Sequence, residues 1–450
     1  MNVVLLSTYE MGRQPFGLAS PAAWLRRAGA SVTCLDLSRE PLQEEVIRAA
    51  SLIAFYLPMH TATRLAVAAL PRLGRLNSSA HLCFYGLYAP VNETFLRGLG
   101  AQTILGGEFE TGLASLVERL RAGLDGPQVE PVVSLERSRF LVPERQGLPP
   151  LSEYARLRLG DGKSRTVGYT EASRGCQHLC RHCPVVPVYQ GRFRVVNREV
   201  VLEDIRRQVA AGAQHITFGD PDFFNGPGHS MAIVRALHSE FPELSYDVTI
   251  KIEHLLKQAA HLSALRATGC LLVTSAVESI DDHVLRLLDK GHTREDVLRA
   301  LELCRQARLT LVPTFVPFTP WTSQEGYREL LEFLARNDLV HNLAPIQLAI
   351  RLLIPSGSRL LELPEVLGLV GAFEPAALSY RWEHPDPRMD ELCRQILALV
   401  KQAEARRATR AEIFAQIWDL AHQNAPVAFP WEANRLDRAA IPYINEPWYC

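Results

Sequence analysis

Residues 174–184 read RGCQHLCRHCP and place three cysteines, Cys176, Cys180 and Cys183, in one short segment. Their spacing is Cys-x3-Cys-x2-Cys, and no fourth cysteine lies nearby in the sequence. A cubane [4Fe–4S] cluster normally takes four cysteines, so three thiolates would leave one iron open. An open iron can bind and activate a substrate, whereas a fully ligated cluster mainly carries electrons. The segment therefore predicts a cluster with a chemical role.

Two other uses of these cysteines have to be weighed. His178 and His182 alternate with the cysteines, so a Cys3His zinc site is an alternative. Five metal-capable side chains within eight residues are too crowded for all of them to bind one tetrahedral ion, which favours the cluster. A disulfide framework is excluded more firmly, because nine cysteines in 450 residues is a sparse and odd number.

The composition is that of an ordinary globular protein, with 47% hydrophobic and 22% charged residues. The chain carries 48 basic and 49 acidic residues, a balance that gives no reason to expect nucleic acid or an anionic membrane as partner. The first residues, MNVVLLSTYE, predict a strand rather than a signal peptide, and no apolar run approaches the ~18 residues of a membrane span. We expect a cytoplasmic protein, where clusters survive.

The first 125 residues alternate short apolar runs with helical stretches. This alternation predicts an α/β fold that begins with a doubly wound, Rossmann-like domain over residues 1–125. Ligands of such sheets bind at the carboxyl ends of the strands. The expected strands are Val3–Leu6, Val32–Leu37, Leu52–Leu57 and His81–Tyr85.

Prolines and glycines interrupt residues 126–165, which we interpret as a linker. Residues 166–365 then repeat strand and helix six times and predict a partial (β/α)6 TIM-type barrel, with its site at the strand carboxyl ends. The expected strands are Thr166–Ala172, His215–Gly219, Leu244–Ile250, Leu271–Ala276, Leu309–Phe315 and Ile346–Leu353. Residues 366–450 are predicted to be mostly helical, with Met389–Arg406 and Thr409–Gln423 as the clearest helices.

The cysteine spacing, and its place after the first barrel strand, resemble those of radical S-adenosylmethionine (radical SAM) enzymes. The resemblance implies that the open iron chelates the amino and carboxylate groups of SAM, and that one electron then cleaves the sulfonium to methionine and a 5′-deoxyadenosyl radical. It also implies an electron donor such as a flavodoxin or ferredoxin. The family often has an aromatic residue before the third cysteine, where this chain has His182.

The resemblance extends to the barrel loops that would hold SAM. The loop after the second barrel strand resembles an acidic variant of the family's Gly-Gly-Glu motif, in which Asp220 or Asp222 would accept hydrogen bonds from the SAM ammonium. Lys251, after the third strand, would pair with the SAM carboxylate. Glu278, followed by Lys290, ends the fourth strand as the family's Glu-Ser does and would face the ribose or methionine part.

Residues 1–125 resemble in layout the cobalamin-binding domain that precedes many radical SAM domains. The resemblance is one of element order, since no Asp-x-His-x-x-Gly motif occurs in these residues. The alternative is a sheet that has lost the cofactor and serves as a scaffold or partner surface. The expected cobalamin contacts are Tyr9, Gly86, Gly106, Gly107 and Glu108.

Together these resemblances imply cobalamin-dependent methyl transfer to an unreactive centre of a small molecule. Cobalamin-dependent ring rearrangement is the nearest alternative. The terminal residues, ending at Cys450, resemble an uncharacterised radical SAM group with a Cys-Cys/Sec-Ala-Glu-Pro tail, so cobalamin-independent sulfur or selenium chemistry is a further alternative. A non-catalytic iron–sulfur or zinc protein that binds a partner is the remaining one.

Overall fold

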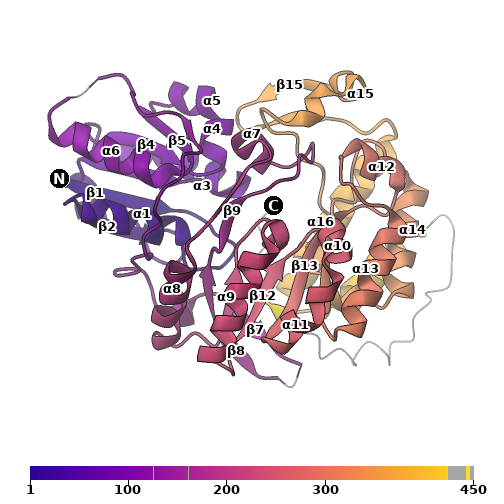
Figure 1. Ribbon diagram of the computed structural model, residues 1–450. Coiled ribbons are helices and arrows are strands. Elements are labelled where there is room, and N and C mark those ends of the chain that lie inside the picture. Colours follow the sequence, from indigo (N-terminus) through magenta and orange to yellow (C-terminus); the bar gives the residue numbers. More distant parts are fainter. Residues whose placement is uncertain (125, 161, 424–441, 446–450) are drawn as a thin grey trace.

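A computed structural model describes residues 1–124, 126–160, 162–423 and 442–445. The predicted tail cysteine, Cys450, lies outside these residues. The first part of the chain forms a six-stranded parallel sheet with the order β2-β1-β3-β4-β5-β6 (Figure 1). Its strands are β1 (Asn2–Ser7), β2 (Ser31–Asp36), β3 (Leu52–Tyr56), β4 (His81–Tyr85), β5 (Thr103–Gly107) and β6 (Val133–Ser134).

Helices cover both faces of this sheet, because successive residues of its strands point to opposite sides. Leu5 packs in the cluster formed with α1 and α6, whereas Leu6 packs in the cluster formed with α2, α3 and α5. This arrangement confirms the doubly wound domain. The helices are α1 (Phe16–Arg27), α2 (Glu44–Arg48), α3 (His60–Leu76), α4 (Tyr88–Val91), α5 (Glu93–Gly98) and α6 (Phe109–Arg121).

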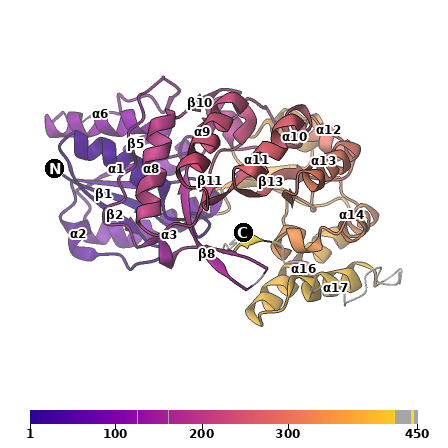
Figure 2. The same cartoon turned by 60° about the horizontal axis from the view of Figure 1, so that its bottom comes forward.

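The second sheet has the order β14-β13-β12-β11-β8-β7-β17 and curls into a partial barrel (Figure 2). Five neighbouring strands are parallel: β8 (Ser164–Thr170), β11 (His215–Phe218), β12 (Ser245–Thr249), β13 (Cys270–Glu278) and β14 (Thr310–Phe315). The short strands β7 (Arg156–Arg158) and β17 (Tyr443–Ile444) extend the sheet in antiparallel fashion at one edge. The outer helices are α8 (Arg198–Ala210), α9 (Pro227–Glu240), α10 (Ile252–Lys257), α11 (Leu262–Ala267), α12 (Asp282–Leu287), α13 (Arg294–Gln306) and α14 (Gln324–Arg336).

The α/β fold class is therefore confirmed, but the expected sixth strand, Ile346–Leu353, does not form. Its first half is a 3-10 turn over Pro345–Leu348, and Arg351 makes a single bridge to Phe318. The side-chain oxygen of Gln347 accepts the backbone N–H of Phe315 at 3.1 Å. The side chain of Gln347 thus replaces one backbone hydrogen bond that a sixth strand would make with β14. The barrel therefore ends in an irregular segment instead of a strand.

The C-terminal region is helical only in part. The expected helices are present as α16 (Pro387–Ala405) and α17 (Arg410–Ala421), which lie side by side (Figure 2). A short helix and an antiparallel hairpin that the sequence did not predict precede them. These are α15 (Pro364–Leu367) with β15 (Val370–Glu374) and β16 (Ser379–Trp382). The predicted domain boundaries at residues 125, 165 and 365 stay predictions.

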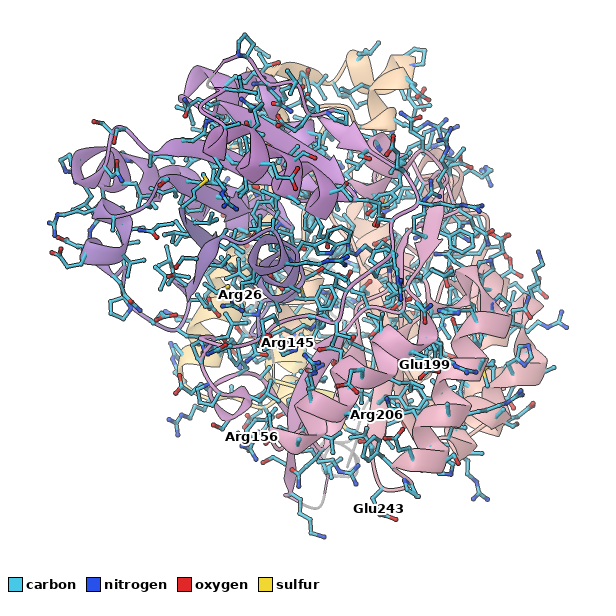
Figure 3. All side chains as sticks on the ribbon, turned by 60° about the vertical axis from the view of Figure 1, so that its left-hand side comes forward. Arg26, Arg145, Arg156, Glu199, Arg206 and Glu243 are labelled. Carbon is cyan, nitrogen blue, oxygen red and sulfur yellow. The ribbon has the colours of Figure 1, made fainter. Side chains whose placement is uncertain are left out.

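The linker fastens the two sheets together. Arg145 donates to Asp204 at 3.0 and 2.9 Å, to the Tyr169 carbonyl at 2.7 Å and to the Gln14 side chain at 3.0 Å. Gln14 belongs to the N-terminal domain, whereas Asp204 lies on α8, and Figure 3 shows Arg145 at this junction. One guanidinium thus fixes the linker against both domains. Among the described residues, no helix is long and apolar enough to cross a membrane.

Candidate functional site

The three cysteines lie in the loop between β9 (Ser173–Gly175) and α7 (Val185–Tyr189). All three are free thiols. Burial, with a smaller contribution from charge repulsion by Cys180, raises the pKa of Cys176 to about 11 and that of Cys183 to about 12. The three thiols therefore lie near enough to interact electrostatically. Iron would deprotonate such thiols outright, so this donor set fits a cluster.

The backbone before the first cysteine is possible only for glycine. Gly175 has φ +74°, and a Cβ there would lie 2.4 Å from the ring of Tyr189 and 2.5 Å from the Arg192 carbonyl oxygen. Asn225 braces the same turn, because its Oδ1 accepts the backbone N–H of Gln177 at 3.2 Å and its Nδ2 donates to the Gly175 carbonyl at 3.3 Å. No local pattern in the sequence marks Asn225 as part of the site, although it ends the acidic loop after β11.

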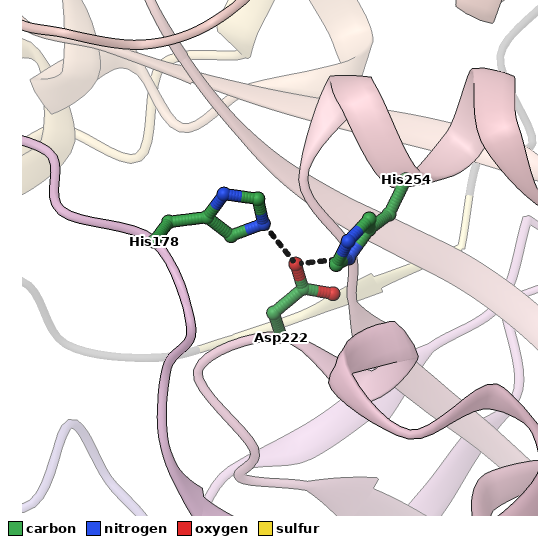
Figure 4. A group of neighbouring side chains, drawn as sticks. All are labelled: His178, Asp222 and His254. Atoms are coloured by element: carbon green, nitrogen blue, oxygen red, sulfur yellow. Dashed lines mark ion pairs between the residues drawn. The ribbon is translucent and has the colours of Figure 1, made fainter. Parts of the chain in front are cut away.

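Two histidines meet Asp222 beside the cysteine loop (Figure 4). Asp222 Oδ2 lies 2.7 Å from His254 Nδ1 and 3.7 Å from His178 Nε2. On the far side of each ring stands a donor: Gln177 Nε2 lies 2.7 Å from His254 Nε2, and Lys251 Nζ lies 3.1 Å from His178 Nδ1. The group joins the cysteine loop to the loop after β11 and to the start of α10.

The same residue types make up 2-His-1-carboxylate metal centres, but the hydrogen bonding here opposes a metal. A lysine ammonium can only donate, so His178 Nδ1 accepts from Lys251 and Nε2 carries the proton that faces Asp222. Burial and the charge of Lys251 lower the pKa of His178 to about 4, which keeps the ring neutral. We assign the trio to holding the cysteine loop in place rather than to binding an ion.

Glu278 ends β13 and connects to the same loop from the other side. It accepts hydrogen bonds from His182 Nε2 at 3.1 Å and Lys290 Nζ at 3.4 Å. Burial alone would raise the pKa of Glu278, but Lys290 and His182 lower it to about 2, so the carboxylate stays charged. This pairing gives His182, the departure from the family's usual aromatic residue, a structural role.

Asp220 is used inside the protein. Its two oxygens accept the backbone N–H of Ala172 at 2.9 Å and the hydroxyl of Ser173 at 2.6 Å. Burial raises the pKa of Asp220 to about 7. The side chain therefore fixes the residues that lead into the cysteine loop. Of the expected SAM contacts, Asp222, Lys251 and Glu278 gather around the cysteines, and all four assignments stay predictions.

At each glycine expected to contact cobalamin, an added Cβ would meet protein atoms, although Gly107 also borders the cavity between the two domains. A Cβ on Gly86 would lie 2.9 Å from the Leu57 carbonyl oxygen, one on Gly106 would lie 2.1 Å from Pro90, and one on Gly107 would lie 2.2 Å from the Ser134 carbonyl oxygen. Tyr9 and Glu108, the other expected contacts, are buried. The five assignments as cobalamin contacts stay predictions.

The space above the strand ends is also small. A cavity of about 230 Å³ lies between the two domains, bordered by Tyr56, Phe109 and Tyr189. A Cβ on Gly17 would lie only 2.1 Å from the Tyr56 ring, and the Tyr85 hydroxyl donates to the Gly17 carbonyl at 2.8 Å. Sites for much smaller, drug-sized ligands span ~300–1,000 Å³. The described residues, as arranged, do not fit a cobalamin.

A buried ion-pair network occupies the interface beside this cavity. Arg174, two residues before Cys176, lies 2.7 Å from Glu110, 2.7 Å from Glu171 and 3.5 Å from Glu108. The arginine side chain is 7% exposed. Burial raises the pKa of Glu108 to about 7, although the Arg174 charge opposes that rise. Two glutamates of the N-terminal domain thereby hold the segment that carries the cysteines.

The three-cysteine loop thus stands beside the strand ends of a partial barrel. The family model described as the radical SAM superfamily matches residues 170–334. These residues therefore carry a radical SAM domain.

Relatives with known names match at low identity. The hopanoid C-3 methylase of Methylococcus capsulatus is 25% identical over 329 residues, which cover 68% of this chain and 62% of that protein. The ribosomal protein uS12 methylthiotransferase RimO of Clostridium botulinum is 23% identical over 176 residues, or 37% of this chain and 39% of that protein. The chain thus spans about two fifths to three fifths of the length of these relatives.

Two solved structures share the fold over most of the chain. The radical S-adenosylmethionine methyltransferase TsrM of Kitasatospora setae, with tryptophan substrate and a SAM analogue bound, superposes with a TM-score of 0.69 at 16% identity and covers 89% of both chains. The cobalamin-dependent radical enzyme OxsB, with aqua-cobalamin and SAM bound, has a TM-score of 0.70 at 14% identity, over 89% of this chain and 67% of that one. The N-terminal domain thus resembles those of cobalamin-binding radical SAM enzymes.

Proposed function

We propose that this protein cleaves S-adenosylmethionine reductively and directs the resulting 5′-deoxyadenosyl radical at a small molecule. The observation that carries the proposal is the loop of three free cysteines, Cys176, Cys180 and Cys183, which lies inside the region that matches the radical SAM superfamily model. Three thiolates with no fourth cysteine in the loop would leave one iron of a cluster open. This donor set favours an open cluster over a Cys3His zinc site, whose ligands are usually spaced in pairs.

Cys176, Cys180 and Cys183 would hold the cluster, which when bound supplies the electron that breaks the sulfonium bond of SAM. Lys251, 9% exposed, would meet the SAM carboxylate, and the charged Glu278 would lie near the rest of SAM. The surrounding barrel would exclude water from the radical. An electron donor such as a flavodoxin or ferredoxin is part of this proposal.

The test is SAM cleavage by the anaerobically reconstituted protein with dithionite, followed by chromatography of 5′-deoxyadenosine and methionine. We expect both products in equal amounts from the wild type and a loss of at least about 100-fold in Cys180→Ala, because the cluster loses one of three ligands. Cys304→Ala is the matched control, since that cysteine is buried in the core away from the loop. No product from a wild type that holds iron and sulfide would reject the proposal.

A second candidate is cobalamin-dependent methyl transfer, which the whole-chain likeness to TsrM and OxsB favours. It requires Tyr56 and its neighbours to move, because the described cavity is too small. Hydroxocobalamin should be offered to the reconstituted protein, followed by desalting and an absorption scan. Equimolar corrinoid retained by the wild type would support methyl transfer. Retention only by Tyr56→Ala, in which the blocking ring is gone, would contradict it.

A further inference from the structure

A second cavity of about 240 Å³ lies inside the barrel sheet. Four threonines on successive parallel strands line it: Thr217 on β11, Thr249 on β12, Thr274 on β13 and Thr314 on β14. The interior of a (β/α) barrel is normally filled by bulky branched apolar side chains. A ring of hydroxyl-bearing residues around an open space therefore suits a polar ligand better than it suits packing.

The cavity also holds a carboxylate with one oxygen to spare. Asp247 Oδ1 accepts from His215 Nε2 at 2.8 Å and from the Thr217 hydroxyl at 2.6 Å. Ser245 Oγ, 2.7 Å from His215 Nδ1, fixes that ring from behind. Among the described residues, no hydrogen bond reaches Asp247 Oδ2, and the side chain is 10% exposed where it lines the cavity. Because both donors bind Oδ1, Asp247 Oδ2 is free to accept a hydrogen bond from a ligand.

An arginine lines the same cavity from the C-terminal helices. Arg410, the first residue of α17, donates to the His341 carbonyl and stacks 4.2 Å from the centre of the Tyr443 ring. Within the described part of the chain, no carboxylate lies within 4.0 Å of its guanidinium. Burial lowers the pKa of Arg410, although Tyr443 and Glu404 oppose that shift.

We infer that this cavity is the substrate pocket and that it takes a small zwitterion of the amino-acid type, with its ammonium on Asp247 and its carboxylate on Arg410. A buried charge is stable only when it is paired, and this cavity is lined by one carboxylate, Asp247, and two arginines, Arg410 and Arg13. Leu272 and Val312, on the walls, would contact a short hydrocarbon side chain. The inference rests on the proposed function, since it names the substrate class of the same barrel.

The position of the cavity fits that role. Gly219 and Thr249 line it, and they directly precede the loops that carry Asp220 and Lys251 beside the cysteines. Lys251 and Glu278 do not line it, so the cavity is separate from the residues expected to hold SAM. Its volume is below the ~300–1,000 Å³ of sites for drug-sized ligands, which favours a small molecule over a polycyclic lipid.

The test uses the reconstituted full-length protein with saturating SAM and no reductant, and measures binding by isothermal titration. The probes are L-norleucine, hexanoate, which lacks the ammonium, and pentylamine, which lacks the carboxylate. We expect norleucine to bind at least about 10-fold more tightly than either single-charge analogue, because each charge adds one charge-assisted hydrogen bond.

Variants assign each charge to its partner. Asp247→Asn should abolish the advantage of norleucine over hexanoate, and Arg410→Gln should abolish its advantage over pentylamine. Asp247 also accepts a hydrogen bond from His215, so Asp247→Asn could unfold the sheet. In that case the affinities of Arg410→Gln alone decide the test. Arg406→Gln, an exposed arginine just before α17, should leave all three affinities unchanged.

Norleucine binding no more tightly than the two analogues, or affinities that neither variant alters, would overturn the inference. Failure of the proposed function is a different result, because it would appear as a wild type that forms no 5′-deoxyadenosine. A wild type that cleaves SAM but ignores norleucine would reject only the pocket assignment.

Discussion

Replacing Arg174 by methionine tests whether the interface network holds the cysteine segment. Methionine approximates the length of the arginine side chain but removes the only charge that faces Glu108, Glu110 and Glu171 in these ion pairs. Removing one partner of a buried ion pair costs about 3–5 kcal/mol, because the remaining charge stays buried without compensation. We expect a loss of that size in the free energy of unfolding at about pH 8.

The loss should shrink in acid. Burial raises the pKa of Glu108 from its ordinary 4.5 to about 7 in the folded protein. A group with a raised pKa contributes stability that is present below its ordinary pKa and lost as the pH rises through the folded value. Without Arg174 the folded pKa of Glu108 rises further, so Glu108 is neutral at about pH 5.5 in the variant and the missing cation matters less.

The assay is urea unfolding of the reconstituted proteins at the two pH values, followed by tryptophan fluorescence. The control is Arg206→Met, since Arg206 pairs with Glu240 at 2.7 Å and Glu203 at 3.5 Å on the surface of α8 (Figure 3). Exposed ion pairs contribute little, so this variant should unfold like the wild type. An Arg174→Met protein as stable as the wild type at about pH 8, or an equal loss at both pH values, would refute the reasoning.

Three further predictions follow from the same contacts. Glu278→Gln should retain its iron but bind SAM about 10-fold more weakly in equilibrium dialysis, because Lys290 loses its charged partner; unchanged affinity would remove Glu278 from the SAM site. Asp220→Asn should cost about 1–3 kcal/mol in urea unfolding, because its amide turns a donor toward a backbone N–H. Because the pKa of Asp220 is raised to about 7, the free energy of unfolding of the wild type should fall as the pH rises through about 7, and this fall should be smaller in Asp220→Asn. An equal fall in both proteins would assign the pH dependence to other groups. Gly175→Ala should lose iron in a colorimetric assay, whereas Gly126→Ala, with open space around its Cβ, should not; equal iron in both would contradict the strained turn.

Local signals in the sequence were enough to predict the cysteine loop and both sheets. The three cysteines share one loop, so their spacing alone predicts the ligand set. The alternation of strands and helices likewise predicts the α/β class, because apolar residues recur with a different period in strands and in helices. The irregular segment at Gln347 was missed since its apolar run resembles a strand, and only the side-chain bond to Phe315 distinguishes it.

Long-range pairing is what the sequence could not provide. Arg174 and Glu110 are separated by 64 positions, and Gln177 and His254 by 77, so no local pattern links them. The sequence also gives no packing around a glycine. Gly86, Gly106 and Gly107 were predicted to contact cobalamin, and the structure adds that a Cβ at each would meet neighbouring protein atoms.

The central claim is that three cysteines hold a cluster whose fourth iron is open to SAM. The most direct measurement is electron–nuclear double resonance of the reduced protein with SAM labelled with ¹⁵N at its amino group. We predict a hyperfine coupling from that nitrogen to the cluster in the wild type and none in Cys180→Ala. A wild type with a full cluster that shows no coupling from SAM, or coupling from a histidine nitrogen in its place, would contradict the account.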